Sequence, residues 1–320
     1  MGNLIRTQFY RYRRSGLFWT AVVSSLMFGY LGGQETAQTY GYYGYLHGRF
    51  NDLVFLPLFL ILAVFLSAAI GREYSDGTMR NQIIAGTTRT CIFWSQLLCS
   101  ILVSLLFSGL FLVTFLYHTT VNPLSYLSLG KKLLALVIFL CVNGTFAVLF
   151  TVGSLTISSR ELGFLCNLLI VGCLVITAAS ALSRLNQPET IEEPYPKQVE
   201  MTPQEVAAFK EGTFKGSVSE EGNDDGLITY YKYVFDTDRS APNPRYLGGT
   251  RRKAAQLWIA VDPYGQICKT VIHLNNSVYN EDPAGLPIPR QLIFFPAFSL
   301  GLSALASLSG VLIFRKKELR

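Results

Sequence analysis

Residue types that carry out catalysis are few in this sequence and lie far apart along it. The three histidines, His47, His118 and His273, are scattered and give no basis for a catalytic triad. The zinc-protease motif H-E-x-x-H and the hydrolase motif G-x-S-x-G are both missing from the sequence. We therefore expect that the chain is not an enzyme.

Nucleotide chemistry is excluded on similar grounds. The phosphate-binding loop G-x-x-x-x-G-K-S/T does not occur, and Gly130-Lys131-Lys132 does not supply one. The chain alone is therefore expected not to hydrolyse ATP, and any ATP and magnesium would be bound by a partner.

The cysteines indicate neither a metal site nor a disulfide in the polar segment. Five of them lie in or at the edge of apolar runs, where cysteine is usually a small buried hydrophobe, namely Cys91, Cys99, Cys141, Cys166 and Cys173. Cys268 stands alone in the polar segment near the C-terminus, and no cysteine and histidine spacing fits zinc. We expect no metal and no cofactor in this chain.

The composition places the chain in a membrane. Half of its 320 residues are hydrophobic, only 15% are charged, and the mean hydropathy is +0.33. The net charge of +6 does not indicate a nucleic-acid-binding surface, because the basic residues lie at the ends of apolar runs. We therefore expect the lipid bilayer as a partner and no nucleic acid.

Six apolar runs are long enough to cross about 30 Å of hydrocarbon as helices. They are Leu17 to Gly33, Leu53 to Ile70, Ile92 to Tyr117, Leu133 to Ile157, Leu162 to Leu182, and Leu292 to Phe314. Residues 3–12 mix apolar and basic side chains, which predicts an amphipathic helix at the membrane interface before a retained first span rather than a cleaved signal peptide. The expected fold is thus an all-α membrane protein with six transmembrane helices.

The positions of lysine and arginine predict the orientation, because these residues stay on the cytoplasmic side of short loops. Lys131 and Lys132 are an exception, but the other basic clusters agree if both termini are cytoplasmic. These clusters are Arg6 to Arg14, Arg72 to Arg89, Arg160, and Arg315 to Lys317. We expect a multi-pass membrane protein with both termini cytoplasmic.

Residues 184–288 form a net acidic insert between the fifth and sixth spans, and we expect a small extracellular α+β domain there. Thr202-Pro203-Gln204-Glu205 is a capping box that predicts a short helix to about Gly212. Ile228 to Phe235 predicts a strand, and Gln256 to Val261, a turn, and Gln266 to Leu274 predict two more. The expected domains are therefore 1–183, 184–288 and 289–320.

The interiors of the six spans contain no Asp, Glu, Lys or Arg, which ion-coupled carriers usually place there. Their polar content is Asn143, Asn167 and scattered serine and threonine. These side chains could line a translocation path, although such residues more often join helices by hydrogen bonds. Uphill transport would need energy from a partner.

The segment from Gly71 to Arg89 is an expected cytoplasmic loop whose sequence predicts a short helix. Met79, Ile83 and Ile84 recur at helical spacing and predict the apolar side of a short helix. From these residues alone, an ordinary basic loop with Arg80 and Arg89 as anchors is an equal alternative.

A resemblance favours a specific role for this segment. Glu73, Gly77-Thr78-x-Arg80 and Gly86-x-x-Arg89 resemble the loop after the second span in ABC type 2 transporter permeases, the integral membrane subunits of bacterial ABC exporters. The basic amphipathic N-terminus, the six spans and the ending Phe314-Arg315-Lys316-Lys317-Glu318-Leu319 are similar to that family as well. The insert is not part of the resemblance.

The resemblance implies a coupling helix that docks in a groove of a separate ATPase subunit. The candidate contacts are Glu73, Gly77, Thr78, Arg80, Ile83, Ile84 and Arg89. It also implies a unit of two permease chains, as a homodimer or a heterodimer, with two ATPase subunits, and it implies that the membrane is a bacterial plasma membrane. The expected substrate is amphipathic, lipid-like or a peptide.

Two questions stay open at this point. The chain could instead be a membrane sensor or immunity protein whose insert binds a ligand such as an antimicrobial peptide. The insert itself could be a lid over the outer mouth or a substrate-binding domain.

Overall fold

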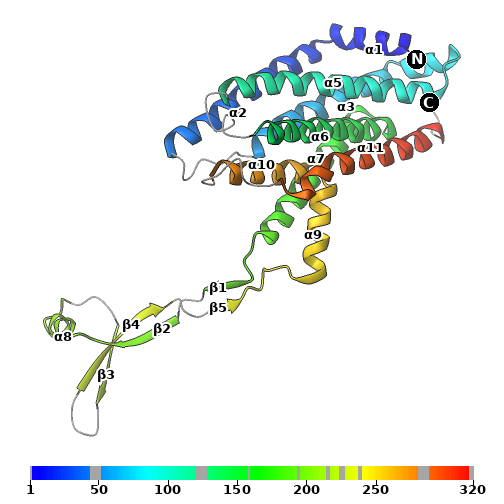
Figure 1. Cartoon of the computed structure of the whole chain (residues 1–320). Helices are drawn as coiled ribbons and strands as arrows, with labels where there is room; N and C mark the ends of the chain where they lie inside the picture. Colours follow the sequence, from blue (N-terminus) through cyan, green and yellow to red (C-terminus); the bar gives the residue numbers. More distant parts are fainter. Residues whose placement is uncertain are drawn as a thin grey trace. The chain divides into compact units, whose positions relative to one another are not determined.

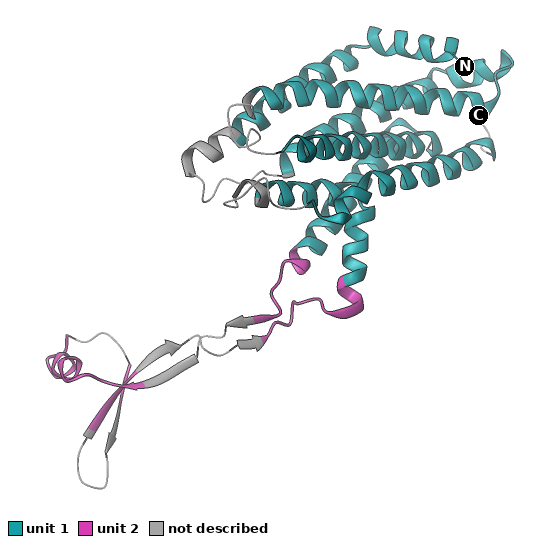
Figure 2. Ribbon diagram, in the orientation of Figure 1, with its two compact units in different colours: residues 1–182, 253–320 teal, residues 183–252 magenta. Residues whose placement is uncertain are grey.

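The structure is a computed structural model, and it describes residues 2–43, 52–119, 128–157, 159–192, 195–213, 217–222, 228–236, 240–279 and 288–316. Contacts within the chain divide it into two compact units (Figure 2). Unit 1 comprises Met1–Leu182 and Lys253–Arg320, and unit 2 is Ser183–Arg252.

Unit 1 is helical and contains six helices that are long and apolar enough to cross a membrane, which confirms the six expected spans. They are α2 (Gly16–Tyr43), α3 (Leu56–Ser75), α5 (Arg89–Thr119), α6 (Leu129–Thr156), α7 (Arg160–Leu185) and α11 (Arg290–Lys316). The short 3-10 helix η2 (Asp52–Phe55) extends the second span at its start. The amphipathic N-terminal segment forms α1 (Gly2–Arg14), and α4 (Thr78–Ile84) lies between α3 and α5.

The core of unit 1 lies around α3 and α6, which bury about half of their apolar segments, whereas α7 and α11 leave most of theirs exposed. The rings of Phe59 and Phe146 stack with centroids 4.2 Å apart and join these two helices. The lipid gives little hydrophobic driving force for the association of apolar helices. Close packing of this kind therefore contributes much of what holds them together.

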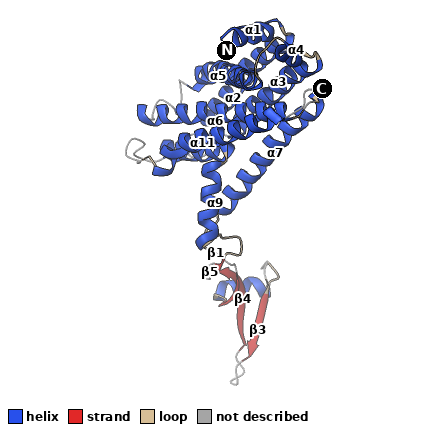
Figure 3. Cartoon of the chain, turned by 90° about the vertical axis from the view of Figure 1, so that its right-hand side faces the viewer, coloured by secondary structure: helices blue, strands red, loops and turns tan. Residues whose placement is uncertain are grey.

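The start of α1 and the end of α11 lie at the same end of unit 1 (Figures 1 and 3). This arrangement follows from an even number of crossing helices. The last four residues, which include part of the basic C-terminal ending, lie outside the described residues.

The two strands expected over Gln256 to Val261 and Gln266 to Leu274 are wrong. These residues belong to helices α9 (Gly249–Val261) and α10 (Pro263–Tyr279). Asp262 starts α10, because its Oδ1 atom accepts a hydrogen bond of 2.9 Å from the backbone N–H of Tyr264 and Pro263 is the first helical residue.

Burial explains why the helix forms in place of the strand. The side chains of Tyr264, Ile267, Cys268 and Val271 are all buried, and their spacing is that of one face of a helix. Helix α10 packs against α6, and the ring of Tyr264 lies edge-on to that of Phe59 in α3. Tertiary burial therefore overrides the strand propensity of the individual residues.

Unit 2 contains two small antiparallel sheets. Strand β1 (Thr190–Glu192) pairs with β5 (Ser240–Pro242), and β4 (Ile228–Asp236) lies between β2 (Tyr195–Glu200) and β3 (Val218–Gly222) (Figures 1 and 3). The strand expected over Ile228 to Phe235 is thus confirmed.

Helix α8 (Pro203–Lys210) confirms the short helix expected after Thr202. The carboxylate of Glu205 accepts hydrogen bonds from the backbone N–H and the hydroxyl of Thr202, which completes the capping box. The Lys232 ammonium group donates a hydrogen bond to Glu205 from β4. These bonds, that of Lys232 above all, lower the pKa of Glu205 to about 2.

The expected insert boundaries at 184 and 288 concern where the chain leaves the membrane. Contacts within the chain do not locate a membrane surface, so this division stays a prediction. Residues 280–287, near its second boundary, lie outside the described residues.

Candidate functional site

Helix α4 forms a separate short element because glycines bound it on both sides. Gly77 has φ +64° and precedes the first helical residue, and Gly86 has φ +87° just after the last turn. Residues with a side chain avoid this left-handed region, so glycine permits both reversals of direction. The N–H of Thr87 bonds to the carbonyl oxygen of Gln82 at 3.0 Å and closes the C-terminal turn.

One face of α4 is held by the core of unit 1. Met79 is buried and belongs to a hydrophobic cluster with Ile70, Phe93 and Phe314, from α3, α5 and α11. Ile83 packs against the edge of the same cluster. The short helix is thus fixed to the ends of three long helices, which is the requirement for an element that transmits a displacement.

A second face of α4, about 100° around the helix from Met79 and Ile83, is exposed. Ile84 has 74% of its surface accessible. Arg80 is exposed as well and lies one turn earlier on the same face of the helix. The apolar side expected for Met79, Ile83 and Ile84 is therefore divided: the first two residues anchor the helix, and Ile84 is available to a partner.

Glu73 lies inside the bundle rather than on this exposed surface. Its side chain is 6% exposed, and its Oε2 atom accepts a hydrogen bond from the Gln96 side chain of α5. The Gln96 Oε1 atom accepts a bond of 3.2 Å from the hydroxyl of Tyr12. Glu73 is thereby joined to α1 through α5.

Helix α1 makes a second polar contact in the same place. The Gln8 side-chain nitrogen donates to the Ser95 hydroxyl oxygen at 3.5 Å, and Gln8 is fully buried. Burial, followed by the nearby charge of Glu73, raises the pKa of the Tyr12 hydroxyl well above its ordinary value, so this hydroxyl keeps the proton that it donates. The amphipathic N-terminal helix is therefore fixed to the segment that leads into α4.

Two further bonds gather the helix ends around α4. The Arg89 guanidinium donates to the carbonyl oxygen of Arg315 at 3.0 Å and links the start of α5 to the end of α11. The Tyr74 hydroxyl donates to the carbonyl oxygen of Leu155 at 2.6 Å and links α3 to α6. Gly77, Thr78, Arg80, Ile83, Ile84 and Arg89 are thus brought together at one end of unit 1, with Glu73 behind them.

Asn143 and Asn167 lie elsewhere, in the interior of the bundle and without solvent exposure. The Asn167 amide donates to the Ser67 and Ser154 hydroxyl oxygens at 2.8 and 3.0 Å and joins α7 to α3 and α6. The Asn143 amide bonds to the carbonyl oxygen of Phe139, one turn earlier on α6. The structure shows both as hydrogen-bonding residues between or along helices, and a role in a path stays a prediction.

Sequence patterns alone did not identify Gln8, Tyr12 and Gln96. Gln8 and Tyr12 are one helical turn apart, which places them on the same face of α1, but nothing local indicates that this face meets α5. Among the described residues, no three histidine, cysteine or acidic side chains come together in a group that could hold a metal ion.

Comparison with known proteins identifies the membrane part of the chain. A family model described as an ABC-2 family transporter protein matches residues 4–180, more than half of the chain. No curated protein and no solved structure matches it. The matched residues include α1, the loop with α4, and most of the first five spans. The chain therefore belongs to the ABC-2 transporter family, as a membrane component of the kind that lacks an ATPase domain.

Proposed function

We propose that the chain is the permease subunit of an ATP-driven exporter in a bacterial plasma membrane. Two permease chains form the translocation path, and two separate ATPase subunits bind ATP and magnesium. Both termini and α4 face the cytoplasm, and unit 2 lies outside the cell. The transported molecule is amphipathic, lipid-like or a peptide, since the apolar runs that form the middle of the six spans contain no Asp, Glu, Lys or Arg.

The observation that supports this proposal is the two-sided construction of α4. Met79 anchors the helix in the core, whereas Arg80 and Ile84 are exposed. A partner that pushes on this surface would move the ends of α3, α5 and α11 together, because the cluster around Met79 joins them. Such an element couples an external motor to the bundle.

Within this proposal Glu73 is a positioning residue. It holds the end of α3 against α5 and, through Gln96 and Tyr12, holds α1 beside α4. The direct contacts with the ATPase come from Arg80 and Ile84 on α4 and from α1.

The test uses the full chain reconstituted in vesicles with an ATPase subunit encoded next to it. We expect the rate of ATP hydrolysis to change when the chain is added, and Ile84→Asp to abolish that change. Leu129→Asp is the matched control, because Leu129 is 71% exposed but stands at the start of α6, at the other end of the bundle. The proposal fails if Ile84→Asp and the wild-type chain change the rate equally.

A further inference from the structure

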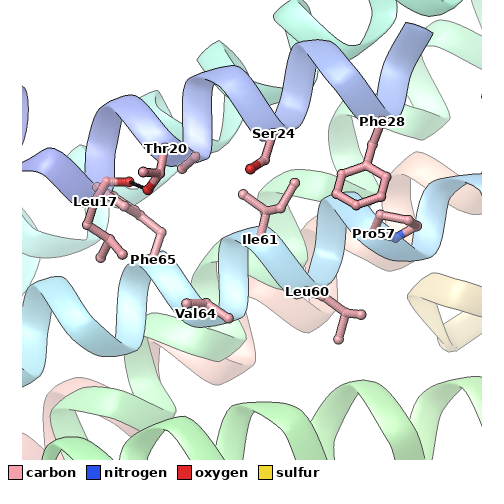
Figure 4. Close-up of a pocket in the computed structure, with 10 residues that line it drawn as sticks. Leu17, Thr20, Ser24, Phe28, Pro57, Leu60, Ile61, Val64 and Phe65 are labelled. Atoms are coloured by element: carbon pink, nitrogen blue, oxygen red, sulfur yellow. Dashed lines mark hydrogen bonds between the residues drawn. The ribbon is translucent and has the colours of Figure 1, made fainter. Parts of the chain in front are cut away.

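A groove between α2 and α3 is a feature of unit 1 that the proposed coupling does not use. It is open on one side and has a volume of about 450 Å³, within the range of small-molecule sites. Both helices contribute side chains, and we call this cavity the α2–α3 groove (Figure 4). Its lining includes Leu17, Ser24 and Phe28 from α2, and Pro57, Ile61 and Phe65 from α3.

The walls of the groove suit hydrocarbon. Ile61 points from α3 toward α2, facing Ser24 in the middle of the groove (Figure 4). The Thr20 hydroxyl donates to the carbonyl oxygen of Leu17 at 2.9 Å, so its bonding capacity as a donor is used within the helix. No charged side chain lines the cavity. Thr20 and Ser24 are the polar side chains of the lining, so an acyl chain meets mostly apolar walls and a charged headgroup meets no counter-ion.

The length of the groove matches one leaflet of a bilayer. Leu17 and Phe28 mark its ends on α2, and the rise of an α-helix places them about 16 Å apart. The hydrocarbon core of a membrane is about 30 Å thick, so this length is close to the thickness of one leaflet.

A group of arginines lies near the end of the groove that Leu17 marks. Arg13 and Arg14 end α1 just before Leu17, and both are exposed. Arg72 is exposed as well and lies about two turns beyond Phe65, toward the same end. Within the described residues neither Arg13 nor Arg14 forms an ion pair with a carboxylate. These cations are available to an anion at the membrane surface.

We infer that the α2–α3 groove binds one anionic phospholipid, with an acyl chain along Leu17 to Phe28 and the phosphate beside Arg13 and Arg14. The apolar walls, the one-leaflet length and the basic end each match one part of such a lipid. A second copy of the chain fits this face less well, because a two-fold interface would set the same arginines near their counterparts. The inference requires insertion in a membrane and does not rest on the docking of an ATPase.

The experiment measures lipid retained by the purified full chain after exchange from vesicles of phosphatidylglycerol and phosphatidylcholine into detergent. Native mass spectrometry counts the bound lipids. We expect one retained phosphatidylglycerol per chain, and at least an about tenfold loss in Ser24→Phe, which fills the groove, equivalent to about 1.4 kcal/mol. Val23→Phe is the matched control, because Val23 is the preceding residue and is 62% exposed. This control should retain the lipid.

The headgroup contact is tested separately. Arg13→Gln with Arg14→Gln should remove the preference for phosphatidylglycerol over phosphatidylcholine, whereas Arg6→Gln, an exposed arginine earlier on α1, should keep it. If Ser24→Phe does not fold, Ile61→Phe fills the groove from α3 instead.

Two results would overturn the inference. One is equal retention of phosphatidylglycerol in the wild-type chain and in the folded groove-filling variants. The other is a change from dimer to monomer in those variants with bound lipid unchanged, which would assign the groove to a second copy.

Discussion

Among the individual residues, Glu73 is a motif residue whose burial gives it a different role from the one that the sequence suggests. The sequence places a carboxylate at the entrance to the coupling loop, where it could contact a partner directly. In the structure its side chain is buried and is bonded to Gln96, which in turn accepts a bond from Tyr12. A buried carboxyl group held by one neutral donor is sensitive to the loss of that donor.

Replacing this donor is expected to destabilise unit 1. Gln96→Leu removes the hydrogen bonds to Glu73 and Tyr12 and leaves both buried, at a cost of about 1–3 kcal/mol. The measurement is chemical denaturation of the purified chain in detergent. Gln291→Leu changes an exposed glutamine near the start of α11 and should be close to neutral. Equal stability of the Gln96→Leu variant and the wild type would show that the network is not formed.

Asp262 gives a prediction for pH. Burial raises the pKa of this carboxyl to about 6, although the backbone N–H groups of Gly265 and Tyr264 and the hydroxyl of Thr177 oppose the shift. The folded chain therefore binds this proton more tightly than the unfolded chain, in which the pKa is about 3.9. Stability should fall as the pH rises from about 4 to about 6, by at most about 1.4 kcal/mol per pH unit.

The measurement compares the melting temperature of the wild type and of Asp262→Asn across that range of pH. The variant should lose the part of the slope that Asp262 contributes. Asp76→Asn, which changes an exposed carboxyl beside α4, should keep it. The assignment is refuted if the melting temperatures of the wild type and of Asp262→Asn change with pH by the same amount.

At the scale of elements, α4 depends on the two glycines that bound it. Gly77→Ala forces a side chain into the left-handed region at φ +64°, at a cost of about 1–2 kcal/mol. The expected results are a lower melting temperature and weaker binding of the ATPase. Gly130→Ala is the control, since a Cβ atom there meets nothing within 4 Å in helix α6 and should be neutral or slightly stabilising. The same melting temperature for Gly77→Ala and Gly130→Ala would contradict the strained turn.

The elements also show how far sequence reasoning reaches. Apolar length predicted the six spans, because a helix must cross a fixed thickness of hydrocarbon. The capping box at Thr202 predicted α8 for an equally local reason. Both predictions depend on nearby residues alone.

Prediction from the sequence was wrong, or was not possible, where contacts between residues far apart in the chain determine the structure. Residues 256–274 have mixed local propensity, and burial of Tyr264, Ile267 and Val271 selects the helix. The hydrogen bonds that join Tyr12 and Glu73 to Gln96 connect residues far apart in sequence, so no local sequence pattern predicts them. The sequence placed Arg80, Ile84 and Glu73 in one loop. It did not predict that Arg80 and Ile84 are exposed while Glu73 is buried.

At the scale of the whole molecule, the two units have different expected roles. Unit 1 holds most of the residues of the six spans, whereas unit 2 contains the short strands and α8. Deletion of residues 187–248, replaced by a short glycine and serine linker, should leave the binding of the ATPase unchanged, because the described contacts of the coupling site come from α1, α3, α4, α5, α6 and α11.

The same deletion tests the alternative function. A sensor or immunity protein would lose its activity with residues 187–248 and keep it when α4 is altered by Ile84→Asp. A permease would show the reverse dependence on α4. The comparison uses the resistance or export phenotype of cells that carry each variant.

The central claim is that α4 is the attachment point of an external motor. The most direct measurement is the Kd of the neighbouring ATPase subunit for the full chain in vesicles. Loss of apolar burial at Ile84 is worth about 1.5–3 kcal/mol, so Ile84→Asp should weaken binding by about 10- to 100-fold, and Leu129→Asp should not. An unchanged Kd for Ile84→Asp, in a chain that is folded, would contradict the claim.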